Sequence, residues 1–416
     1  MTRSATVVGG GPAGLMAAEV LATAGVRVTV YEHMPSVGRK LLLAGRGGLN
    51  ITHNEAFDTL LGRYGKEAHR LEAAIRAFGP GELRSWCAGL GETTFVGSTG
   101  RVFPASFRAT PLLRAWLAQL QRMGVTIEVR HRWLGWSKSN EDEGDSHRSL
   151  FSRPDGTITE VAGDVTVLAL GGASWPRVGS DGTWVSTLRD VGIRVNDLRP
   201  ANCGVCIGWT THFSERFGGV PLKNVAVSVG ETSVRGDAMV TGYGMEAGPV
   251  YALSSTIRDT LDRDGRCIMN IDLCPDLTID AVTQRLARRR PKDSLATSLR
   301  GTIGLSPATS SLLREATGNN VPTEPEELAV LIKAVPLVIE STAPLARAIS
   351  SAGGVALEEV DDSFMLRRMP GTFVVGEMLD WEAPTGGYLL QASLSTAVAA
   401  ATGAVAWLDE LGATAH

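Results

Sequence analysis

The 416-residue sequence predicts an α/β fold in which a domain with a parallel sheet is interrupted by a β-rich insertion. Residues 5–32 follow the order strand, glycine turn, helix, strand, which is a βαβ unit. A continuous apolar segment at 165–170 is typical of a parallel strand that is buried on both faces. After residue 191 the pattern changes to short alternating segments separated by Gly and Pro, which indicates antiparallel strands.

The first glycine turn satisfies the GxGxxG pattern through Gly9, Gly11 and Gly14, after a strand and before a helix. Gly9 permits the sharp turn, Gly11 lets the backbone approach a pyrophosphate, and Gly14 lets the helix and strand pack closely. Pro12 and Ala13 begin the helix, whose free N–H groups and dipole stabilise phosphate charge. The segment therefore predicts a Rossmann-type dinucleotide site.

The identity of the dinucleotide depends on other segments. Glu32 ends the second strand about twenty residues after the turn, where a carboxylate accepts hydrogen bonds from the adenosine ribose. The glycine pattern by itself fits both NAD and FAD. The strand end that contains Ala169, Gly171 and Gly172 resembles the second glycine turn of FAD-binding folds.

A segment near the C-terminus favours FAD more specifically. Gly376 and Glu377 follow a strand and are expected to meet the ribityl and phosphate part of the cofactor. Gly387, Tyr388 and Gln391 stand at the start of an Ala-rich helix, whose N-terminus is expected to face N1 and O2 of the flavin. Because reduced flavin is anionic at that edge, the helix dipole would stabilise it.

Composition and charge exclude several classes of protein. The net charge of −4 and the pI near 6.0 give no broad basic field for nucleic acid or anionic lipid, and the basic run 288–290 is predicted to be a solvated helix face. No apolar stretch reaches the ~18 residues that a membrane helix needs, so we expect a cytoplasmic protein without a membrane partner. Cys203 and Cys206 lack a second cysteine pair of matching spacing, which favours buried strand residues over a zinc or redox site. No metal site is predicted.

Several motifs in order are more specific than any one glycine turn. They occupy residues 8–14, 38–52, 100–104 and 376–391, with a further segment at 243–249 inside the insertion. Together they resemble the BaiN-like family (bile-acid-inducible reductase and aminoacetone oxidase) of FAD-dependent oxidoreductases, nearly end to end. The resemblance implies a Rossmann-type FAD-binding domain, a barrel-like β-rich insertion and a small helical cap. The expected bounds are 1–193 with 351–416 for the FAD domain, 194–275 with 336–350 for the insertion, and 276–335 for the cap.

The resemblance also implies further cofactor contacts. Lys40, Asn50 and Thr52 would lie along the flavin, with Lys40 a candidate to contact phosphate or ring. The family often has Gly-Arg-Cys-Asn before the threonine, whereas residues 47–50 here are Gly-Gly-Leu-Asn. Any role of that arginine or cysteine is therefore not carried over to this chain.

Two flavin reactions fit the resemblance. In the first, a C=C bond conjugated to a carbonyl is reduced, with Tyr388 and Tyr243 as candidate acids for the α-carbon. NADH or NADPH would be a transient donor, because no second GxGxxG follows a strand between 150 and 350. In the second, a small amine or amino ketone is oxidised by oxygen. A third alternative, a redox carrier or sensor without a substrate, is disfavoured because a cap encloses a pocket. The expected partner is a small molecule, and the sequence leaves the substrate and the oligomeric state open.

Overall fold

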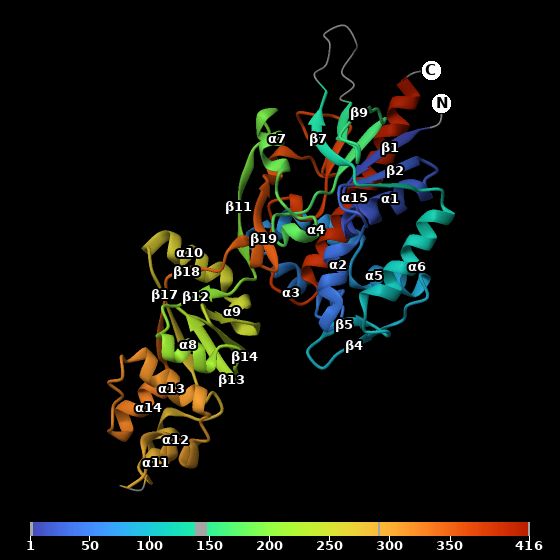
Figure 1. Cartoon of the computed structure of the whole chain (residues 1–416). Helices are drawn as coiled ribbons and strands as arrows, with labels where there is room; N and C mark the ends of the chain where they lie inside the picture. The colour runs from blue at the N-terminus through green and yellow to red at the C-terminus, as the bar shows by residue number, and fades with distance from the viewer. Residues whose placement is uncertain (1–2, 138–147, 290–291, 415–416) are drawn as a thin grey trace. The chain divides into compact units, whose positions relative to one another are not determined.

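The computed structural model describes residues 3–137, 148–289 and 292–414 (Figure 1). The chain forms two compact units, and each is described by itself. Unit 1 comprises Met1–Arg199 and Ser350–His416, and unit 2 comprises Pro200–Ile349. The N-terminal and C-terminal parts of the sequence thus share one unit, and the middle of the chain forms the other.

A parallel sheet lies at the centre of unit 1. Its strand order is β20-β10-β1-β2-β6, and every neighbouring pair is parallel. The strands are β1 (Ser4–Val8), β2 (Arg27–Glu32), β6 (Thr126–Val129), β10 (Val165–Leu168) and β20 (Thr372–Val374). The chain proceeds from β1 outward through β2 to β6, then returns to the opposite side of β1. This reversal creates a topological switch point at the carboxyl ends of β1 and β10.

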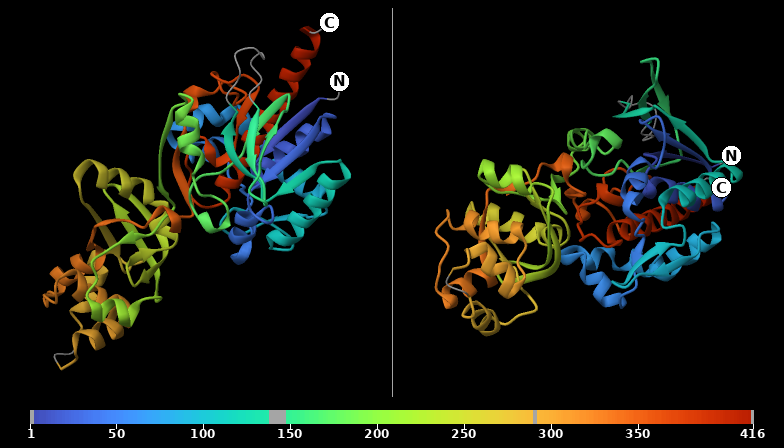
Figure 2. Two further views of the ribbon diagram at one scale, coloured as in Figure 1. Left: turned by 45° about the horizontal axis from the view of Figure 1, so that its top comes forward. Right: turned by 60° about the horizontal axis from the view of Figure 1, so that its bottom comes forward.

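Two helices pack side by side against this sheet, α1 (Pro12–Thr23) and α15 (Tyr388–Thr414), as Figures 1 and 2 show. The helix α15 carries small buried residues such as Ala397 and Ala401, a composition that suits close helix packing. By length and composition α15 could also cross a membrane, so the expectation that no apolar stretch is long enough is wrong. Half of its apolar window is buried, as in the core helix of a globular unit.

A three-stranded antiparallel sheet covers part of β2. It consists of β7 (Arg132–Trp136), β8 (Ser149–Ser152) and β9 (Ile158–Val161), and Tyr31 stacks on Phe151 with ring centroids 4.2 Å apart. In the sequence, the polar run 137–149 followed by the apolar-polar segment 158–161 predicts a single hairpin whose loop is that run. The structure adds β8 between the two, and residues 138–147 lie outside the described residues.

The remaining elements of unit 1 surround this core. A second small sheet has the order β3-β5-β4. The bounds are α2 (Arg39–Ala44), β3 (Thr52–His53), α3 (Phe57–Gly62), α4 (Ala68–Ala77), α5 (Pro80–Gly89), β4 (Thr94–Val96), β5 (Arg101–Pro104), α6 (Ala109–Arg122) and α7 (Trp184–Asp190). The chain leaves unit 1 through β11 (Val195–Ala201) and returns to it through β19 (Ser350–Val355). These two strands pair with each other.

Unit 2 is built on a seven-stranded antiparallel sheet of order β17-β16-β13-β14-β15-β12-β18. Its strands are β12 (Val205–Cys206), β13 (Pro221–Val229), β14 (Thr232–Thr241), β15 (Gly244–Glu246), β16 (Cys267–Asp272), β17 (Val335–Ile339) and β18 (Ser341–Thr342). Its helices are α8 (Thr211–Phe217), α9 (Gly248–Ala252), α10 (Ser254–Asp264), α11 (Ile279–Leu286), α12 (Leu295–Ile303), α13 (Pro307–Ala316) and α14 (Pro325–Lys333). Sheet and helices share one apolar core.

Two local predictions in unit 2 need correction. The strand expected around the cysteine pair is only two residues long, Val205–Cys206, so Cys203 is buried outside it. Arg288 and Arg289 of the basic run do not lie on a helix, because α11 ends at Leu286. Arg290 lies outside the described residues.

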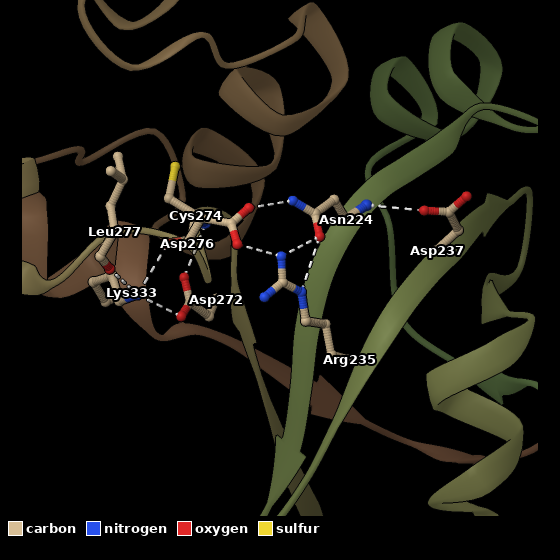
Figure 3. Close-up of polar contacts among 8 residues, drawn as sticks. All are labelled: Asn224, Arg235, Asp237, Asp272, Cys274, Asp276, Leu277 and Lys333. Carbon is tan, nitrogen blue, oxygen red and sulfur yellow. Dashed lines mark hydrogen bonds and ion pairs between the residues drawn. The ribbon is translucent and has the colours of Figure 1, made fainter. Parts of the chain in front are cut away.

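A half-buried lysine and an exposed arginine hold the connection between the sheet and the helices of unit 2 (Figure 3). The Nζ atom of Lys333, at the end of α14, lies 2.6 Å from Oδ2 of Asp272 and donates to the carbonyl oxygens of Cys274 at 3.0 Å and Leu277 at 2.6 Å. Arg235 on β14 pairs with Asp276 at 2.5 Å in the same connection. The segment between β16 and α11 is thereby held from both sides.

Candidate functional site

A pocket opens at the switch point of the parallel sheet, where ligands bind in open α/β folds. It is formed by the turn after β1, the ends of β2 and β10, the start of α2 and the segment after β20. Its lining consists of Gly9, Gly10, Gly11, Pro12, Ala13, Glu32, His33, Ser36, Gly38, Arg39, Lys40, Ala169, Leu170, Gly171, Val178, Gly179, Ser180, Val375, Glu377 and Ser393. Segments that are more than 300 residues apart in sequence therefore meet here.

The three glycines of the turn meet different structural requirements. Gly9 has φ +109°, and a Cβ there would lie 2.3 Å from the carbonyl oxygen of Ala169. A Cβ on Gly14 would lie 1.9 Å from the carbonyl oxygen of Gly9. A Cβ on Gly11 would meet no atom within 4 Å, and its φ of −80° suits any residue. The fold thus requires Gly9 and Gly14, whereas Gly11 faces open space at the N-terminus of α1.

Glu32 is tied to the turn that it faces. Its Oε2 accepts the N–H of Gly10 at 2.8 Å, and its Oε1 accepts the N–H of Met34 at 2.7 Å. Only 8% of the residue is exposed, and it lines the pocket. Each carboxylate oxygen retains acceptor capacity, so Glu32 can receive hydroxyl donors from a ligand while it holds the glycine turn.

A charged pair lies on another side of the pocket. Lys40 Nζ lies 2.7 Å from Oε2 of Glu377 and donates to Oγ of Ser174, also at 2.7 Å. Oε1 of Glu377 accepts the N–H of Ser351 at 2.9 Å. The structure thus brings together two residues that the sequence assigned to the cofactor from separate motifs. An ion pair at this position offers both a donor and an acceptor to a polar ligand.

The glycines beside this pair allow close packing. Gly376 has φ +70°, and a Cβ there would lie 2.9 Å from Cβ of Ala13 at the start of α1. A Cβ on Gly172 would lie 2.3 Å from Oγ of Ser351. Gly376 thus keeps the segment after β20 close to the first helix, and Gly172 keeps the segment after β10 close to β19.

Ser180 is a pocket residue that the sequence analysis missed. Its Oγ is buried and has no hydrogen-bond partner among the described residues. A Cβ on Gly171 would lie 3.2 Å from this hydroxyl, so the glycine avoids a tight contact with it. A buried hydroxyl without a partner is costly unless a ligand or water completes it. A serine between glycines in a loop carries no sequence signal of this kind.

Four predicted site residues lie together outside the pocket lining. The hydroxyl of Thr52 donates to Gln391 Oε1 at 2.6 Å, and Asn50 Nδ2 donates to the carbonyl oxygen of Thr52 at 2.9 Å. Gly387 has φ +96°, and a Cβ there would lie 2.6 Å from the backbone of Thr52. Their contacts join β3 to the N-terminus of α15. The Oδ1 atom of Asn50 is buried without a described partner.

Tyr388, the first residue of α15, is held by a carboxylate. Its hydroxyl donates to Oε1 of Glu55 at 2.8 Å, and Arg63 donates to both oxygens of Glu55 at 3.0 and 2.9 Å. The hydrogen bonds from Arg63 lower the pKa of Glu55. Burial, followed by the Glu55 carboxylate, raises the pKa of Tyr388. The tyrosine is therefore protonated at neutral pH and has its proton engaged.

Tyr243 has a similar environment in unit 2. Its hydroxyl donates to Oε2 of Glu246 at 2.8 Å, and the guanidinium of Arg347 lies 5.4 Å from the ring centroid. Burial and the Glu246 carboxylate raise the pKa of Tyr243. The two tyrosines that the sequence named as acids thus belong to different units, and each already donates to a carboxylate.

A second pocket continues from the first along the sheet edge. The two share Gly9, His33, Leu170 and Gly179. The second is further lined by Val8, Tyr31, His131, Arg132, Trp133, Leu134, Asp181, Thr183, Trp184 and Thr187. The crevice therefore extends from the glycine turn toward β7, which the sequence analysis did not connect with a ligand.

A family model described as HI0933-like protein Rossmann domain matches residues 3–403. The chain belongs to this family. A relative, "3-dehydro-bile acid delta(4,6)-reductase" of Clostridium scindens, is 27% identical over 94% of this chain and 96% of its own length. The "Ribosomal RNA dihydrouridine synthase" of Haemophilus influenzae is 22% identical over 95% of this chain and 96% of its own.

Solved structures with lower identity share the fold of this HI0933-like chain. The 3-ketosteroid delta1-dehydrogenase of Sterolibacterium denitrificans is 13% identical with a TM-score of 0.56, covering 97% of this chain and all of that one. A flavocytochrome c3 fumarate reductase is 12% identical with a TM-score of 0.54, covering 98% of this chain and 79% of that one. Together the matches confirm the predicted BaiN-like resemblance, the Rossmann-type α/β fold class and the class of flavin-dependent oxidoreductase enzymes.

Proposed function

We propose that this chain binds FAD at the switch point and reduces a C=C bond conjugated to a carbonyl in a small organic substrate. The observation that carries the cofactor assignment is the open space at Gly11 between the N-terminus of α1 and the carboxylate of Glu32. At the N-terminus of α1, free backbone N–H groups and the helix dipole favour a pyrophosphate. Beside the Glu32 carboxylate, hydrogen bonding favours a ribose. The buried, unpartnered hydroxyl of Ser180 supports a ligand in the same pocket.

The remaining pocket residues suit the other parts of FAD. Gly11, Pro12 and Ala13 would hold the pyrophosphate, and the second pocket beyond Gly9 would take the adenine. The Lys40 ammonium and the Glu377 carboxylate, which pair with each other in this structure, would instead hold the phosphate and ribityl groups. The strand end that contains Ala169, Gly171 and Gly172 would border the same groups, and Gly376 would keep α1 within reach.

The N-terminus of α15 would support the ring end of the cofactor. Asn50, Thr52 and Gln391 fix this terminus through hydrogen bonds, and Gly387 permits its contact with β3. A flavin bound there would supply hydride transfer through its N5 atom. The helix dipole and the Lys40 ammonium would stabilise negative charge beside the ring. Tyr388, which lies in the same unit, would give the proton, and its hydroxyl must first leave the Glu55 carboxylate to do so.

The reaction class is supported by the names of two relatives. A reductase of double bonds in a 3-dehydro bile acid and a synthase of dihydrouridine both hydrogenate a ring C=C bond conjugated to a carbonyl. We therefore favour reduction over the oxidation of a small amine or amino ketone by oxygen, and over a redox carrier without a substrate. NADH or NADPH is proposed as the donor, docking transiently.

The reductive half of this proposal is tested with the purified protein. Flavin released by denaturation should be FAD rather than FMN, in one equivalent per chain. Anaerobic mixing with NADH or NADPH should bleach the visible flavin absorption within the time of turnover. FMN in place of FAD would contradict the assignment of Glu32, and bleaching only by small amines would favour the oxidase.

A further inference from the structure

Two polar groups in the switch-point pocket are buried and have no hydrogen-bond partner among the described residues. They are the Oγ atom of Ser180 and the Nε atom of Arg39. Both residues line the pocket, Arg39 from the start of α2 and Ser180 from the segment after β10. A buried polar group without a partner costs free energy, and such groups are normally completed by protein, water or ligand. Two of them in one pocket indicate a ligand that accepts hydrogen bonds.

Ser180 stands beside the first glycine turn because its segment contacts both strands that flank β1. A Cβ on Gly171, which follows β10, would lie 3.2 Å from the Ser180 hydroxyl oxygen. A Cβ on Gly179, the residue before Ser180, would lie 3.3 Å from Cε1 of His33, which follows β2. In the sheet β1 lies between β10 and β2. The segment therefore reaches from one neighbour of β1 to the other, at the end where the turn 9–11 begins.

Arg39 reaches the same turn from the start of α2. The N–H of Gly38, the residue before it, donates to the carbonyl oxygen of Gly10 at 2.8 Å. A Cβ on Gly10 would lie 2.4 Å from Cγ1 of Val37, so the chain that leads into α2 packs directly on the turn. The Arg39 guanidinium donates through Nη1 to Oγ of Ser36 at 3.1 Å. Its Nε–H is left for an acceptor in the pocket.

The charges of the pocket also assign Arg39 to an anion. The lining contains an arginine and a lysine, Arg39 and Lys40, and the carboxylates of Glu32 and Glu377. Lys40 is paired with Glu377 at 2.7 Å, whereas Arg39 forms no ion pair within the described part of the chain. A diphosphate adds two negative charges beside Glu32, and the dipole of α1 offsets only about half a charge. The guanidinium of Arg39 is the remaining positive charge that can offset them.

We infer that Arg39 and Ser180 bind the pyrophosphate of the cofactor, the arginine through its Nε–H and its charge and the serine through its hydroxyl. The inference rests on the proposed function and adds to it the side chains that recognise the diphosphate. Guanidinium and hydroxyl groups are both suitable donors to phosphate oxygens. Each group completes its hydrogen bonding only when the ligand is bound. The chain without flavin therefore retains two unsatisfied buried groups, a cost that FAD binding removes.

The test compares two probes that differ only in the diphosphate, ADP and adenosine. Their affinities for the full chain, freed of flavin, are measured by displacement of bound FAD. Arg39→Gln should weaken ADP binding about 10- to 150-fold, as expected for one lost hydrogen bond to a charged group, and leave adenosine binding unchanged. Ser180→Ala should weaken ADP binding about tenfold, again without an effect on adenosine. Added salt should weaken ADP binding less steeply in Arg39→Gln than in wild type, whereas Arg39→Lys should retain the wild-type slope.

Stability of the flavin-free chain is a second readout, and it separates a ligand contact from a structural role. Because the Ser180 hydroxyl has no partner there, Ser180→Ala should raise the midpoint of urea unfolding while it weakens ADP binding. Ser393 is the matched control, since it lines the same pocket but its hydroxyl donates to the carbonyl oxygen of Leu389 at 2.7 Å. Ser393→Ala should neither raise the midpoint nor change the preference for ADP. Arg27→Gln, at the other end of β2, is the control for charge.

The possible outcomes separate this inference from the proposed function. If Arg39→Gln and Ser180→Ala bind FAD and ADP as wild type does, the cofactor assignment stands and the inference fails. It also fails if Arg39→Gln weakens adenosine and ADP in the same proportion, or if Ser180→Ala lowers the midpoint and leaves ADP binding intact. If wild type binds neither FAD nor ADP, both fail. If the preference for ADP responds as expected but no conjugated ketone reoxidises the reduced flavin, the inference stands and the proposed reaction fails.

Discussion

Gly11→Ala should separate cofactor binding from folding. The added methyl meets no protein atom within 4 Å, and the backbone at φ −80° and ψ −179° suits alanine. The loss of chain entropy in the unfolded state favours the variant by roughly 0.4–1 kcal/mol, and alanine is a poorer helix N-cap by a similar amount. The free energy of unfolding of the apoprotein should therefore change by less than about 1 kcal/mol.

In the proposed site the same methyl would occupy the place of a pyrophosphate oxygen. Loss of one hydrogen bond to a charged group costs about 1.5–3 kcal/mol, which weakens FAD binding roughly 10- to 150-fold. Gly11→Val, with a larger side chain, should abolish binding. Affinity is measured by the quenching of FAD fluorescence, and stability by urea unfolding of the apoprotein.

Two neighbouring variants complete the comparison. Gly14→Ala places a Cβ 1.9 Å from the carbonyl oxygen of Gly9, so it should destabilise the apoprotein by about 1–3 kcal/mol whether or not FAD is present. Gly81→Ala, in the first turn of α5 with no atom within 4 Å, should change neither quantity. Full FAD occupancy in Gly11→Val, or a large loss of apoprotein stability in Gly11→Ala, would refute the reasoning.

Three further predictions concern named residues. Glu32→Ala should weaken FAD binding by about 1.5–3 kcal/mol and leave turnover at saturating FAD near wild type; a collapse of turnover with the cofactor bound would assign Glu32 another role. Ala247→Gly should stabilise the protein by roughly 1–2 kcal/mol in urea unfolding, because φ +76° and ψ +173° suit glycine alone, and an unchanged midpoint would contradict this. Glu19→Ala should destabilise the apoprotein by about 1–3 kcal/mol, because it leaves three side-chain N–H donors without their acceptor. Burial raises the pKa of Glu19 although these donors lower it, so the free energy of unfolding of wild type should fall as pH rises from about 4.5 through the folded-state pKa; the Ala variant should lack this slope.

The parts of the site that were predictable from sequence are those that the local backbone requires. Gly9 and Gly14 are needed by a turn and a helix contact within ten residues, and Glu32 stands at a fixed distance from them. The pairing of Lys40 with Glu377 depends on how distant segments meet, which no local pattern encodes. The hydroxyl of Ser180 differs from that of other loop serines only through its surroundings.

Helix and strand bounds were likewise predictable only where a local signal fixes them. The helix that begins at Pro307 was predictable because Ser306 caps it, with its hydroxyl accepting the N–H of Thr309. The helix α11 ends at Leu286, earlier than expected, although the arginines that follow are good helix formers. Likewise β8 was missed, because its four residues pair with two strands that the sequence had joined directly.

Reoxidation of the reduced flavin is the most direct test of the proposed reaction. The flavin is reduced photochemically without oxygen and mixed with a panel of conjugated ketones that includes 1,4-androstadiene-3,17-dione, and separately with oxygen. The proposed function predicts that at least one ketone restores the visible flavin absorption faster than oxygen does, with its C=C bond hydrogenated in the product. Rapid return with oxygen and none with any ketone would contradict it.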